Sequence, residues 1–273
     1  MNDEVKLIRP GTTSLNAYIN SIWNSRALIY TFAWQELKVQ YSQTMLGVLW
    51  AVLRPMIILL IFTLIFGRLI KVPGITMPYA LFAFSGLMAW NYFNFIVNNG
   101  SSVIINNQNL IRKFYFPKVI LLLSKSLVGL VEFFISLALL FALMAILRFE
   151  FTLHIAWFLF FIMLNLLSGL TVALWLSALS VRYRDINQFV LPLIGFVIWL
   201  TPVFYPVTLI PSAYSFVLFF NPLSGIIQGY RFALLGGEFL PIQYFYTFAI
   251  VGLLFFIGLL IFIRVEDDMP DYL

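Results

Sequence analysis

The sequence predicts an all-α integral membrane protein, and three observations support this fold class. Its 273 residues are 62% hydrophobic and only 10% charged, a composition that is not typical of soluble globular proteins. Uncharged stretches at 72–111, 155–181, 186–230 and 239–263 are each longer than the roughly 20 residues that a membrane-spanning helix needs. Lysine and arginine are also distributed unequally between the segments that join the apolar stretches, as in multi-pass membrane proteins.

Six transmembrane helices are predicted within one transmembrane domain that covers residues 1–273. They lie at 45–68, 78–103, 119–147, 155–180, 188–205 and 240–263. With both termini in the cytoplasm, twelve of the 16 Lys and Arg residues fall at cytoplasmic positions, which is the bias that the positive-inside rule describes. We therefore expect both termini to be cytoplasmic. We expect no cleaved signal peptide, because the first 25 residues are polar or amphipathic.

Residues 14–35 predict an amphipathic helix that precedes the first span. Leu15, Tyr18, Ile22 and Ile29 recur at helical spacing, with polar residues between them. Such a helix is typical of the cytoplasmic membrane interface. A soluble helix packed on a partner protein is the alternative.

Between the fifth and sixth spans, residues 206–238 are apolar but interrupted by prolines. Two apolar halves, near 212–220 and 223–235, are separated at Asn221 and followed by Gly236. Each half is roughly 15 Å long as a helix, about half of a bilayer. This pattern predicts a re-entrant helical hairpin that enters from the outer face and lines a pathway. A buried hairpin with a purely structural role is the alternative.

No catalytic residue is predicted. The chain has one histidine, His154, and no cysteine, and no carboxylate cluster accompanies this histidine, so we expect no metal site. The phosphate-binding pattern GxxxxGK[ST] does not occur. We therefore expect no cofactor in this chain, and any ATP that drives it is hydrolysed by another polypeptide. A net charge of +5 on a membrane chain gives no reason to expect nucleic acid as a partner.

The second predicted span carries uncharged polar residues on one helix face. Asn91, Asn94, Asn98 and Ser101 recur at steps of three and four residues, so they lie on the same side of the helix. Two interpretations stay open. The stripe either lines a hydrated path suited to hydroxyl-rich ligands, or it forms hydrogen bonds between helices.

Charged residues inside predicted spans are candidate functional residues. Arg54 follows Trp50 by one helical turn and either lines the path or extends towards the cytoplasmic head groups. Glu132 lies two turns after Lys125, an arrangement that favours a structural ion pair between helices over a proton relay. Arg231, within the predicted hairpin, either contacts an anionic substrate group or stabilises the hairpin itself.

Aromatic residues gather in the middle and outer half of the predicted spans. Most membrane aromatics anchor the protein at the interface or pack in its core, but rings beside amides and hydroxyls also suit stacking on sugars. The aromatic candidates for a polysaccharide channel are Trp50, Trp90, Trp199, Phe204 and Tyr205.

Three stretches resemble the polysaccharide-exporting ABC-2 permeases, the membrane subunits that export O-antigen, capsule or teichoic acid. They are LKVQYSQTMLGVLWAVLRPMIILLIFTLIFG at 37–67, NLIRKFYFPK at 109–118, and RDINQFVLPLIGFVIWLTPVFYP continuing to NPLSGIIQGYR at 184–231. The resemblance implies a homodimer with a continuous central channel, driven by two copies of a cytoplasmic ATPase that binds ATP and magnesium. It also implies an N-terminal interface helix and outer gate helices before the last span, where the hairpin is predicted.

In this family the position of NLIRKFYFPK is the coupling helix, which docks in a groove of the ATPase. We expect it at 108–117, with an end before Pro117, exposed aromatics as anchors and the cations Arg112, Lys113 and Lys118 facing carboxylates of the partner. A second cytoplasmic turn contributes Arg184 and Asp185, and Asp185 with Gln188 predicts a helix-start box. The candidate coupling residues are Leu110, Ile111, Arg112, Lys113, Phe114, Tyr115, Phe116, Arg184 and Asp185.

The expected function is that of a channel-forming permease subunit in an exporter of lipid-linked O-antigen across the bacterial inner membrane. Export of capsular polysaccharide or teichoic acid is the first alternative, followed by export of a small molecule. A membrane transferase is disfavoured, because no histidine or carboxylate cluster lies at a membrane face. Two positions depart from the family pattern: relatives often carry more arginine around Tyr41, where this chain has Gln40 and Ser42, and Arg54 replaces an uncharged polar residue. The resemblance therefore assigns no role to Arg54.

Overall fold

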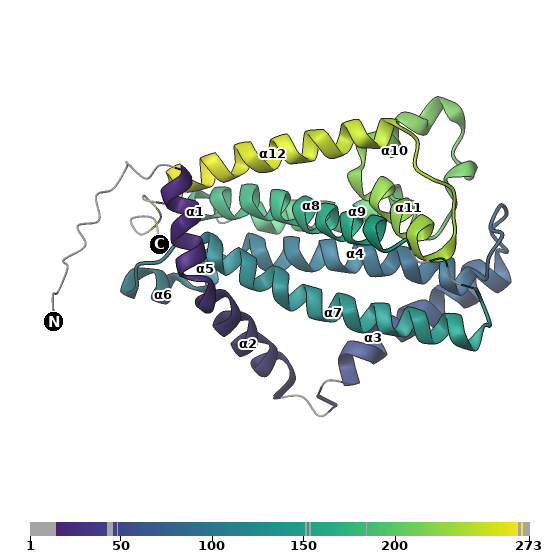
Figure 1. Cartoon of the computed structure of the whole chain (residues 1–273), viewed down its shortest axis with the longest axis horizontal. Coiled ribbons are helices and arrows are strands. Elements are labelled where there is room, and N and C mark those ends of the chain that lie inside the picture. Colours follow the sequence, from purple (N-terminus) through teal and green to yellow (C-terminus); the bar gives the residue numbers. More distant parts are fainter. Residues whose placement is uncertain are drawn as a thin grey trace.

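The computed structural model describes residues 15–42, 46–47, 49–150, 152, 154–183, 185–266 and 269, and these form helices with no β-strand. The first helices are α1 (Leu15–Asn24), α2 (Arg26–Ser42), α3 (Leu49–Phe62), the π-helix η1 (Thr63–Leu69), α4 (Tyr79–Ser101), α5 (Val103–Asn106), α6 (Gln108–Lys113) and α7 (Val119–Ile146). The later ones are α8 (Ile155–Arg182), α9 (Ile186–Leu200), the 3-10 turns η2 (Val207–Leu209) and η3 (Ser212–Tyr214), α10 (Ser215–Phe220), α11 (Pro222–Leu235) and α12 (Gln243–Glu266). The helices α4, α7, α8 and α12 run along one another as a bundle (Figure 1).

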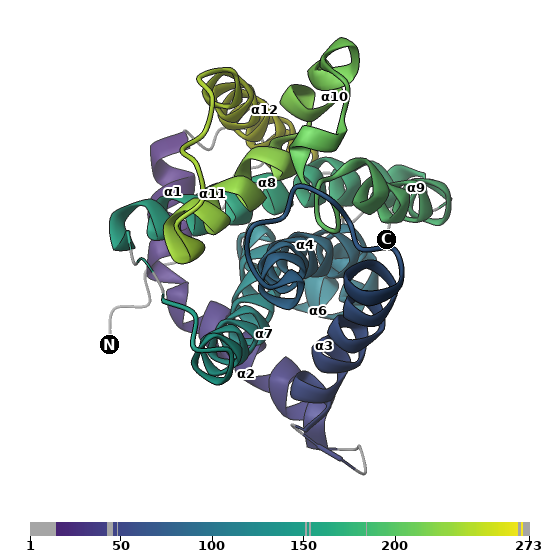
Figure 2. The same ribbon diagram turned by 90° about the vertical axis from the view of Figure 1, so that its right-hand side faces the viewer.

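Helix α4 occupies the centre of this bundle. It packs against α7, α8 and α11, and the end-on view shows it surrounded by these helices together with α3 and α9 (Figure 2). It is the most buried of the long apolar helices. Helix α11 also approaches α8 closely, because a Cβ atom at Gly229 would lie 2.4 Å from the ring of Phe161. A small residue is therefore required at this helix crossing.

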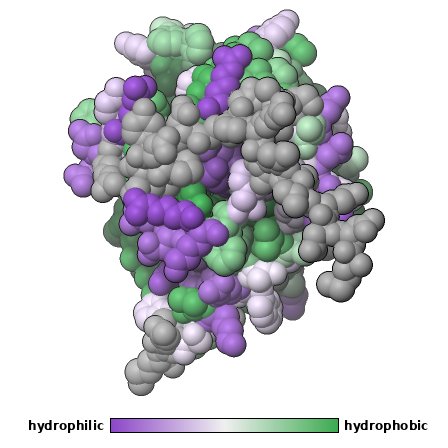
Figure 3. Space-filling model, turned by 90° about the vertical axis from the view of Figure 1, so that its left-hand side faces the viewer, coloured by the Kyte–Doolittle hydropathy of each residue, from purple (hydrophilic) through white to green (hydrophobic). Residues whose placement is uncertain are grey.

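Successive long helices run in opposite directions along the bundle (Figure 1). As a result, α1, α5, α6 and the last turn of α12 lie together at one end, which we call the α6 end. The loop between η1 and α4 lies with α10 and α11 at the opposite end, which we call the α11 end. Figure 3 looks at the α6 end and shows hydrophilic side chains gathered there among hydrophobic ones.

Five of the six predicted spans correspond to helical segments that are long and apolar enough to cross a membrane. Within the described residues these are Leu49–Leu69, Tyr79–Ser101, Val119–Ile146, Ile155–Arg182 and Gln243–Glu266, so the chain is a multi-pass membrane protein. The remaining predicted span, 188–205, corresponds to α9, which has 15 residues and ends at Leu200. That length is about 22 Å, short of the roughly 30 Å of a hydrocarbon core. The helix ends because Thr201, which precedes Pro202, adopts an extended conformation.

The helix predicted at 14–35 is two helices in the structure. Helix α1 ends at Asn24, and α2 begins at Arg26 and continues to Ser42, seven residues beyond the predicted end. The two helices take different directions because they bind different partners. Helix α1 contacts the end of α12 through Tyr18, whereas α2 packs along α7.

A buried ion pair joins three elements at the α6 end. Lys118, at the start of α7, places its Nζ 3.6 Å from Oε1 of Glu266, and its backbone N–H donates to the same carboxylate at 2.8 Å. The hydroxyl of Tyr18 donates to the other carboxylate oxygen. Burial, and then the charge of Glu266, raise the pKa of the Tyr18 phenol above its usual range, so it remains a donor. The expectation that Lys118 faces a partner protein is therefore wrong, because its carboxylate lies in the same chain.

The two apolar halves predicted between 206 and 238 are helical. The turn η3 and α10 cover 212–220, and α11 covers 222–235. Between them, the side chain of Asn221 accepts a hydrogen bond from the N–H of Leu223 and caps α11. Gly236, with φ of 71°, ends α11 in the left-handed conformation. The sequence therefore located both breaks correctly.

Candidate functional site

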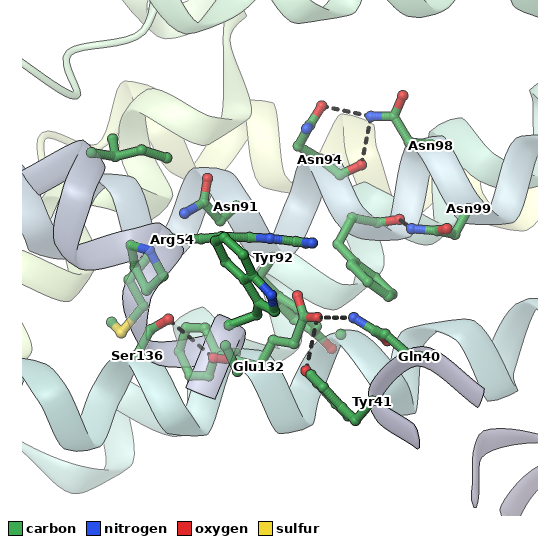
Figure 4. A pocket seen from close by; sticks show the side chains of 18 residues that line it. Gln40, Tyr41, Arg54, Asn91, Tyr92, Asn94, Asn98, Asn99, Glu132 and Ser136 are labelled. Carbon is green, nitrogen blue, oxygen red and sulfur yellow. Dashed lines mark hydrogen bonds between the residues drawn. The ribbon is translucent and has the colours of Figure 1, made fainter. Parts of the chain in front are cut away.

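Four helices, α2, α3, α4 and α7, line a polar cavity of about 390 Å³ (Figure 4). Its polar side chains are Gln40, Tyr41, Arg54, Asn91, Tyr92, Asn94, Asn98, Asn99, Glu132 and Ser136. Among the candidate channel residues, the structure brings together Trp50, Arg54, Asn91, Asn94 and Asn98 in its wall. This cavity is the candidate functional site.

The amides of α4 form one side of the cavity. Asn98 donates its side-chain Nδ2 to the backbone oxygen and to Oδ1 of Asn94, both at 2.8 Å. Asn99 donates to the backbone oxygen of Phe95 at 2.9 Å. These hydrogen bonds stay within α4, so the amides do not join it to a neighbouring described helix. The geometry thus favours a polar lining over hydrogen bonding between helices for Asn94 and Asn98.

Two residues expected on the same path lie in the helix bundle instead. Trp90 is buried, and Ser101 accepts hydrogen bonds on its backbone oxygen from Ser180 of α8 at 3.0 Å and Asn187 of α9 at 3.2 Å. At about 100° per residue, Ser101 lies within about 20° of Asn94 around the helix, so it shares the face of the amides. It leaves the cavity because α8 and α9 cover that face two turns further along α4.

Glu132 of α7 faces the cavity and is held by α2. Its Oε1 accepts hydrogen bonds from Nε2 of Gln40 at 2.6 Å and from the hydroxyl of Tyr41 at 3.3 Å. Burial, and then the charge of Glu132, raise the pKa of Tyr41 to about 12. Two turns earlier, Lys125 pairs with Glu36 of α2 at 2.6 Å. Lys125 and Glu132 therefore bind α2 side by side rather than forming an ion pair with each other.

Arg54 of α3 extends into the cavity and lies, in the view of Figure 4, between the amides of α4 and Glu132. Its guanidinium lies 5.8 Å from the ring centroid of Trp50, which is within the range of a cation–π interaction. No carboxylate of the described residues lies within 4.0 Å of it. Arg54 thus points towards the cavity rather than away from it.

The aromatic candidates at the α11 end contact one another and not the cavity. Phe62 and Phe204 stack with ring centroids 3.7 Å apart and an interplanar angle of 2°. Trp199 lies 5.9 Å from Phe204, and the hydroxyl of Tyr205 donates to the backbone oxygen of Trp199 at 3.1 Å. The chain folds back after α9 ends, which places these rings against α3. The three candidates Trp199, Phe204 and Tyr205 are not part of the cavity wall, and their assignment to the polysaccharide channel stays a prediction.

Arg231 lies in the protein core. Its Nη2 donates to the backbone oxygens of Val203 at 2.9 Å and Phe82 at 3.1 Å, and its guanidinium lies 3.5 Å from the ring centroid of Phe82. These contacts join α11 to α4 and to the turn after α9. Of the two roles left open, the structure favours stabilisation of this part of the fold, because the group faces protein on all sides.

The segment at 108–118 presents cations and aromatics at the α6 end. Its helix, α6, has six residues and ends at Lys113, earlier than the predicted end at 117. The side chains of Phe114 and Tyr115 are 62% and 69% exposed, and those of Arg112 and Lys113 are also exposed.

Three other candidates in this segment are buried or half-buried. Phe116 is only 6% exposed and its ring lies 5.9 Å from that of Phe32 in α2. Ile111 is buried, and Leu110 is half-buried. The expectation of three consecutive exposed aromatics is therefore wrong for Phe116, because its ring packs against Phe32 where α2 passes beside the segment.

The second predicted coupling turn, at Arg184 and Asp185, is only partly described. Arg184 lies outside the described residues. Asp185 begins α9, but its side chain makes no capping hydrogen bond and its backbone is already helical. The predicted helix-start box with Gln188 is therefore absent, because a helical backbone at Asp185 directs the carboxylate away from the free N–H groups.

Sequence reasoning missed the contribution of α2 to the site. Gln40 and Tyr41 lie beyond the predicted interface helix, and Asn99 and Ser136 carried no distinguishing pattern. The charge at Glu132 was the available signal, since a carboxylate within a span requires donors from a neighbouring element. Among the described residues, no three His, Asp or Glu side chains lie close enough to hold a metal ion.

Comparison with known proteins places the chain in a family. The model of the ABC-2 type transporter family matches residues 27–235. The chain is 30% identical to the O-antigen export system permease protein RfbA of Myxococcus xanthus, over 78% of this chain and 82% of that protein. It is 27% identical to the RfbA protein of Klebsiella pneumoniae, over 81% and 88% of the two chains, and 26% identical to the polysialic acid transport protein KpsM of Escherichia coli, over 86% and 92%. With its apolar helices and its family match over most of its length, this chain belongs to the ABC-2 type transporter family and is a multi-pass membrane permease.

Proposed function

We propose that this chain is the permease subunit of an ATP-driven exporter that moves a lipid-linked O-antigen polysaccharide across the bacterial inner membrane. Similarity to O-antigen export permeases over about four-fifths of the chain supports this substrate class. The protein would act as a homodimer with two copies of a cytoplasmic ATPase, and ATP and magnesium would bind to that partner. Export of the polymer would then proceed through a channel formed between the two copies.

The observation that carries this proposal is the row of amides in the cavity. An asparagine side chain both donates and accepts hydrogen bonds, as a sugar hydroxyl does. Asn91, Asn94 and Asn98 face the cavity in successive turns of one helix, so a chain of sugars would meet similar groups as it advances. Uncharged amides also bind sugar hydroxyls without holding any one sugar unit strongly, which suits a polymer that must move along the path.

The same proposal includes a topology of six crossings with both termini in the cytoplasm. Helix α9, with the turn that follows it, would be the fifth of the six crossings, and α10 with α11 would be a re-entrant gate hairpin on the outer side. The helices α1 and α2 would lie in the cytoplasmic interface. Support comes from the alternating helix directions, which leave α1 and the last turn of α12 at the same end, and from the cation bias of the sequence.

We also propose that the exposed part of the segment 110–115 is where the ATPase docks. Tyr115→Ala should release the ATPase during purification, because truncation of a central interface aromatic typically costs about 2 kcal/mol or more. Phe116→Ala is the matched contrast. Its ring packs inside this chain, so its loss should lower stability by about 3–5 kcal/mol. If Phe116→Ala folds normally and loses the ATPase while Tyr115→Ala keeps it, the docking surface is assigned wrongly.

The function itself is tested by export in cells that lack the permease. Asn94→Leu with Asn98→Leu should abolish surface O-antigen while leaving the amount of membrane-inserted protein unchanged, because these amides form no hydrogen bond to another helix of the described residues. Asn165→Leu is the control, since Asn165 donates to the backbone oxygen of Ala89 across two helices at 3.0 Å. That variant should reduce the amount of folded protein. Loss of folded protein in the Asn94 and Asn98 variant as well would show that the amides are structural.

A second candidate function is export of capsular polysaccharide. The similarity to the polysialic acid transport protein KpsM, over 86% of this chain, supports it. Complementation separates the two functions: the gene should restore O-antigen at the surface of a strain that lacks its O-antigen permease. Restoration of capsule alone would favour the second candidate.

A further inference from the structure

The cavity contains a cation whose position is not explained by a partner among the described residues. Arg54 and Glu132 are the charged residues that line it. Arg54 is exposed to the cavity, and the described residues place no carboxylate within 4.0 Å of its guanidinium. A charged side chain within an apolar span is usually paired or directed to a water-filled space, and Arg54 takes the second arrangement.

Glu132 does not take the role of partner because it is engaged elsewhere. Gln40 and Tyr41 both donate to its Oε1, at 2.6 Å and 3.3 Å, and these bonds hold the carboxylate against α2. On the other side of Arg54 stand the neutral amides of α4 (Figure 4). The guanidinium therefore faces groups that bind hydroxyls, with its own N–H donors directed to the cavity.

We propose that the cavity binds a glycan that carries an anionic oxygen group, a carboxylate or a phosphate, and that Arg54 binds this group. The inference rests on the proposed function, in which the cavity receives polysaccharide, and it adds the charge of the polymer. A guanidinium offers paired donors that match two oxygens of a carboxylate or phosphate. The guanidinium also lies 5.8 Å from the centroid of the Trp50 ring, within the range of a cation–π interaction.

The arrangement also accounts for the neighbouring amides. An acidic sugar presents hydroxyls on the same ring that carries its carboxylate, and a sugar phosphate presents them on the ring that carries the phosphate ester. Asn91 and Asn94 line the same cavity as Arg54, so one sugar unit has donors for its charge and partners for its hydroxyls. A neutral sugar would use the amides and leave the guanidinium without an anionic partner.

The test is binding of defined oligosaccharides to the purified full-length chain in lipid nanodiscs. The probes are heptagalacturonate, which carries a carboxylate on each sugar, maltoheptaose, which is neutral, and maltoheptaose 1-phosphate, which carries one terminal phosphate. We expect one or both anionic probes to bind at least tenfold more tightly than maltoheptaose, and this preference to weaken as salt is raised. Preference for the phosphate probe alone would show that Arg54 binds a phosphate at the end of the substrate. Preference for heptagalacturonate alone would show that Arg54 binds acidic sugars along the polymer.

Variants connect the preference to the named residues. Arg54→Gln should reduce binding of the preferred anionic probe about tenfold and leave maltoheptaose unchanged. Glu132→Gln keeps an acceptor for Gln40 but removes the negative charge, so it should strengthen binding of the anionic probe. Arg68→Gln, which removes a cation outside the cavity, is the control for net charge and should change neither.

Two results would overturn the inference. Equal binding of neutral and anionic probes, unchanged by Arg54→Gln and Glu132→Gln, would show that charge is not selected, while the cavity would remain a glycan site. Failure of every probe to bind would refute the glycan path of the proposed function, and the inference with it. If Arg54→Gln fails to fold, Glu132→Gln decides the matter, because unchanged affinity for the anionic probe contradicts the proposal.

Discussion

Replacing Arg231 by leucine should destabilise the protein, and the size of the effect follows from its contacts. The backbone oxygen of Val203 would lose its donor and become an unsatisfied buried acceptor, at a cost of about 1–3 kcal/mol. The backbone oxygen of Phe82 keeps a hydrogen bond from Ser85, so its loss is about 1 kcal/mol. The contact with the Phe82 ring contributes about 2 kcal/mol when it is shielded from water.

Removal of the guanidinium also relieves a cost. Its buried Nε has no hydrogen-bond partner, and the described residues offer its charge no carboxylate within 4.0 Å. Removing the unsatisfied Nε and the unpaired buried charge should stabilise the fold by about 2–3 kcal/mol. The net destabilisation of Arg231→Leu should therefore be about 2 kcal/mol. The stability of Arg231→Lys should lie between that of Arg231→Leu and that of the original chain, because an ammonium keeps the charge but lacks the paired donors of a guanidinium.

The assay is thermal unfolding of the purified chain in detergent. At about 2–4 °C per kcal/mol for a chain of this size, Arg231→Leu should lower the Tm by about 4–8 °C. Arg264→Leu, which removes an exposed cation from α12, is the control and should change stability by at most about 0.5 kcal/mol. An unchanged Tm together with lost export would refute this reasoning and assign Arg231 to substrate binding.

Two further predictions concern topology and pH. Cysteines introduced at Ser212 and Glu238, both exposed in the structure, should react with a membrane-impermeant reagent added outside intact spheroplasts, and labelling of only one of them would contradict the re-entrant hairpin. Because the pKa of Tyr41 is raised to about 12 by burial and then by Glu132, its protonated phenol contributes stability below pH 10 that is lost between about pH 10 and 12. The difference in Tm between the original chain and Tyr41→Phe should therefore shrink from pH 9 to pH 11.5, and a constant difference would show that the hydrogen bond to Glu132 does not stabilise the fold.

The sequence by itself determined where the long helices lie and where the chain must break. Helix α4 was predicted at 78–103 and found at Tyr79–Ser101. The prediction succeeded because the length of an apolar run and the positions of the charged residues that bound it are properties of the local sequence. The ends of α11 were predictable for the same kind of reason. Asn221 caps its start and Gly236 ends it, and both effects depend on a few neighbouring residues.

Only the tertiary structure decided which faces of these helices meet. The stripe of α4 faces the cavity as far as Asn98, whereas Ser101 joins α8 and α9, and helical spacing does not reveal where a neighbouring helix crosses. The partners of Glu132 are more than 90 residues away, on α2, and Phe116 is buried because α2 passes beside it. Backbone hydrogen bonds and partition into the membrane act locally, but helix packing depends on contacts between distant segments. For that reason the helices were predictable, and the composition of the site was not.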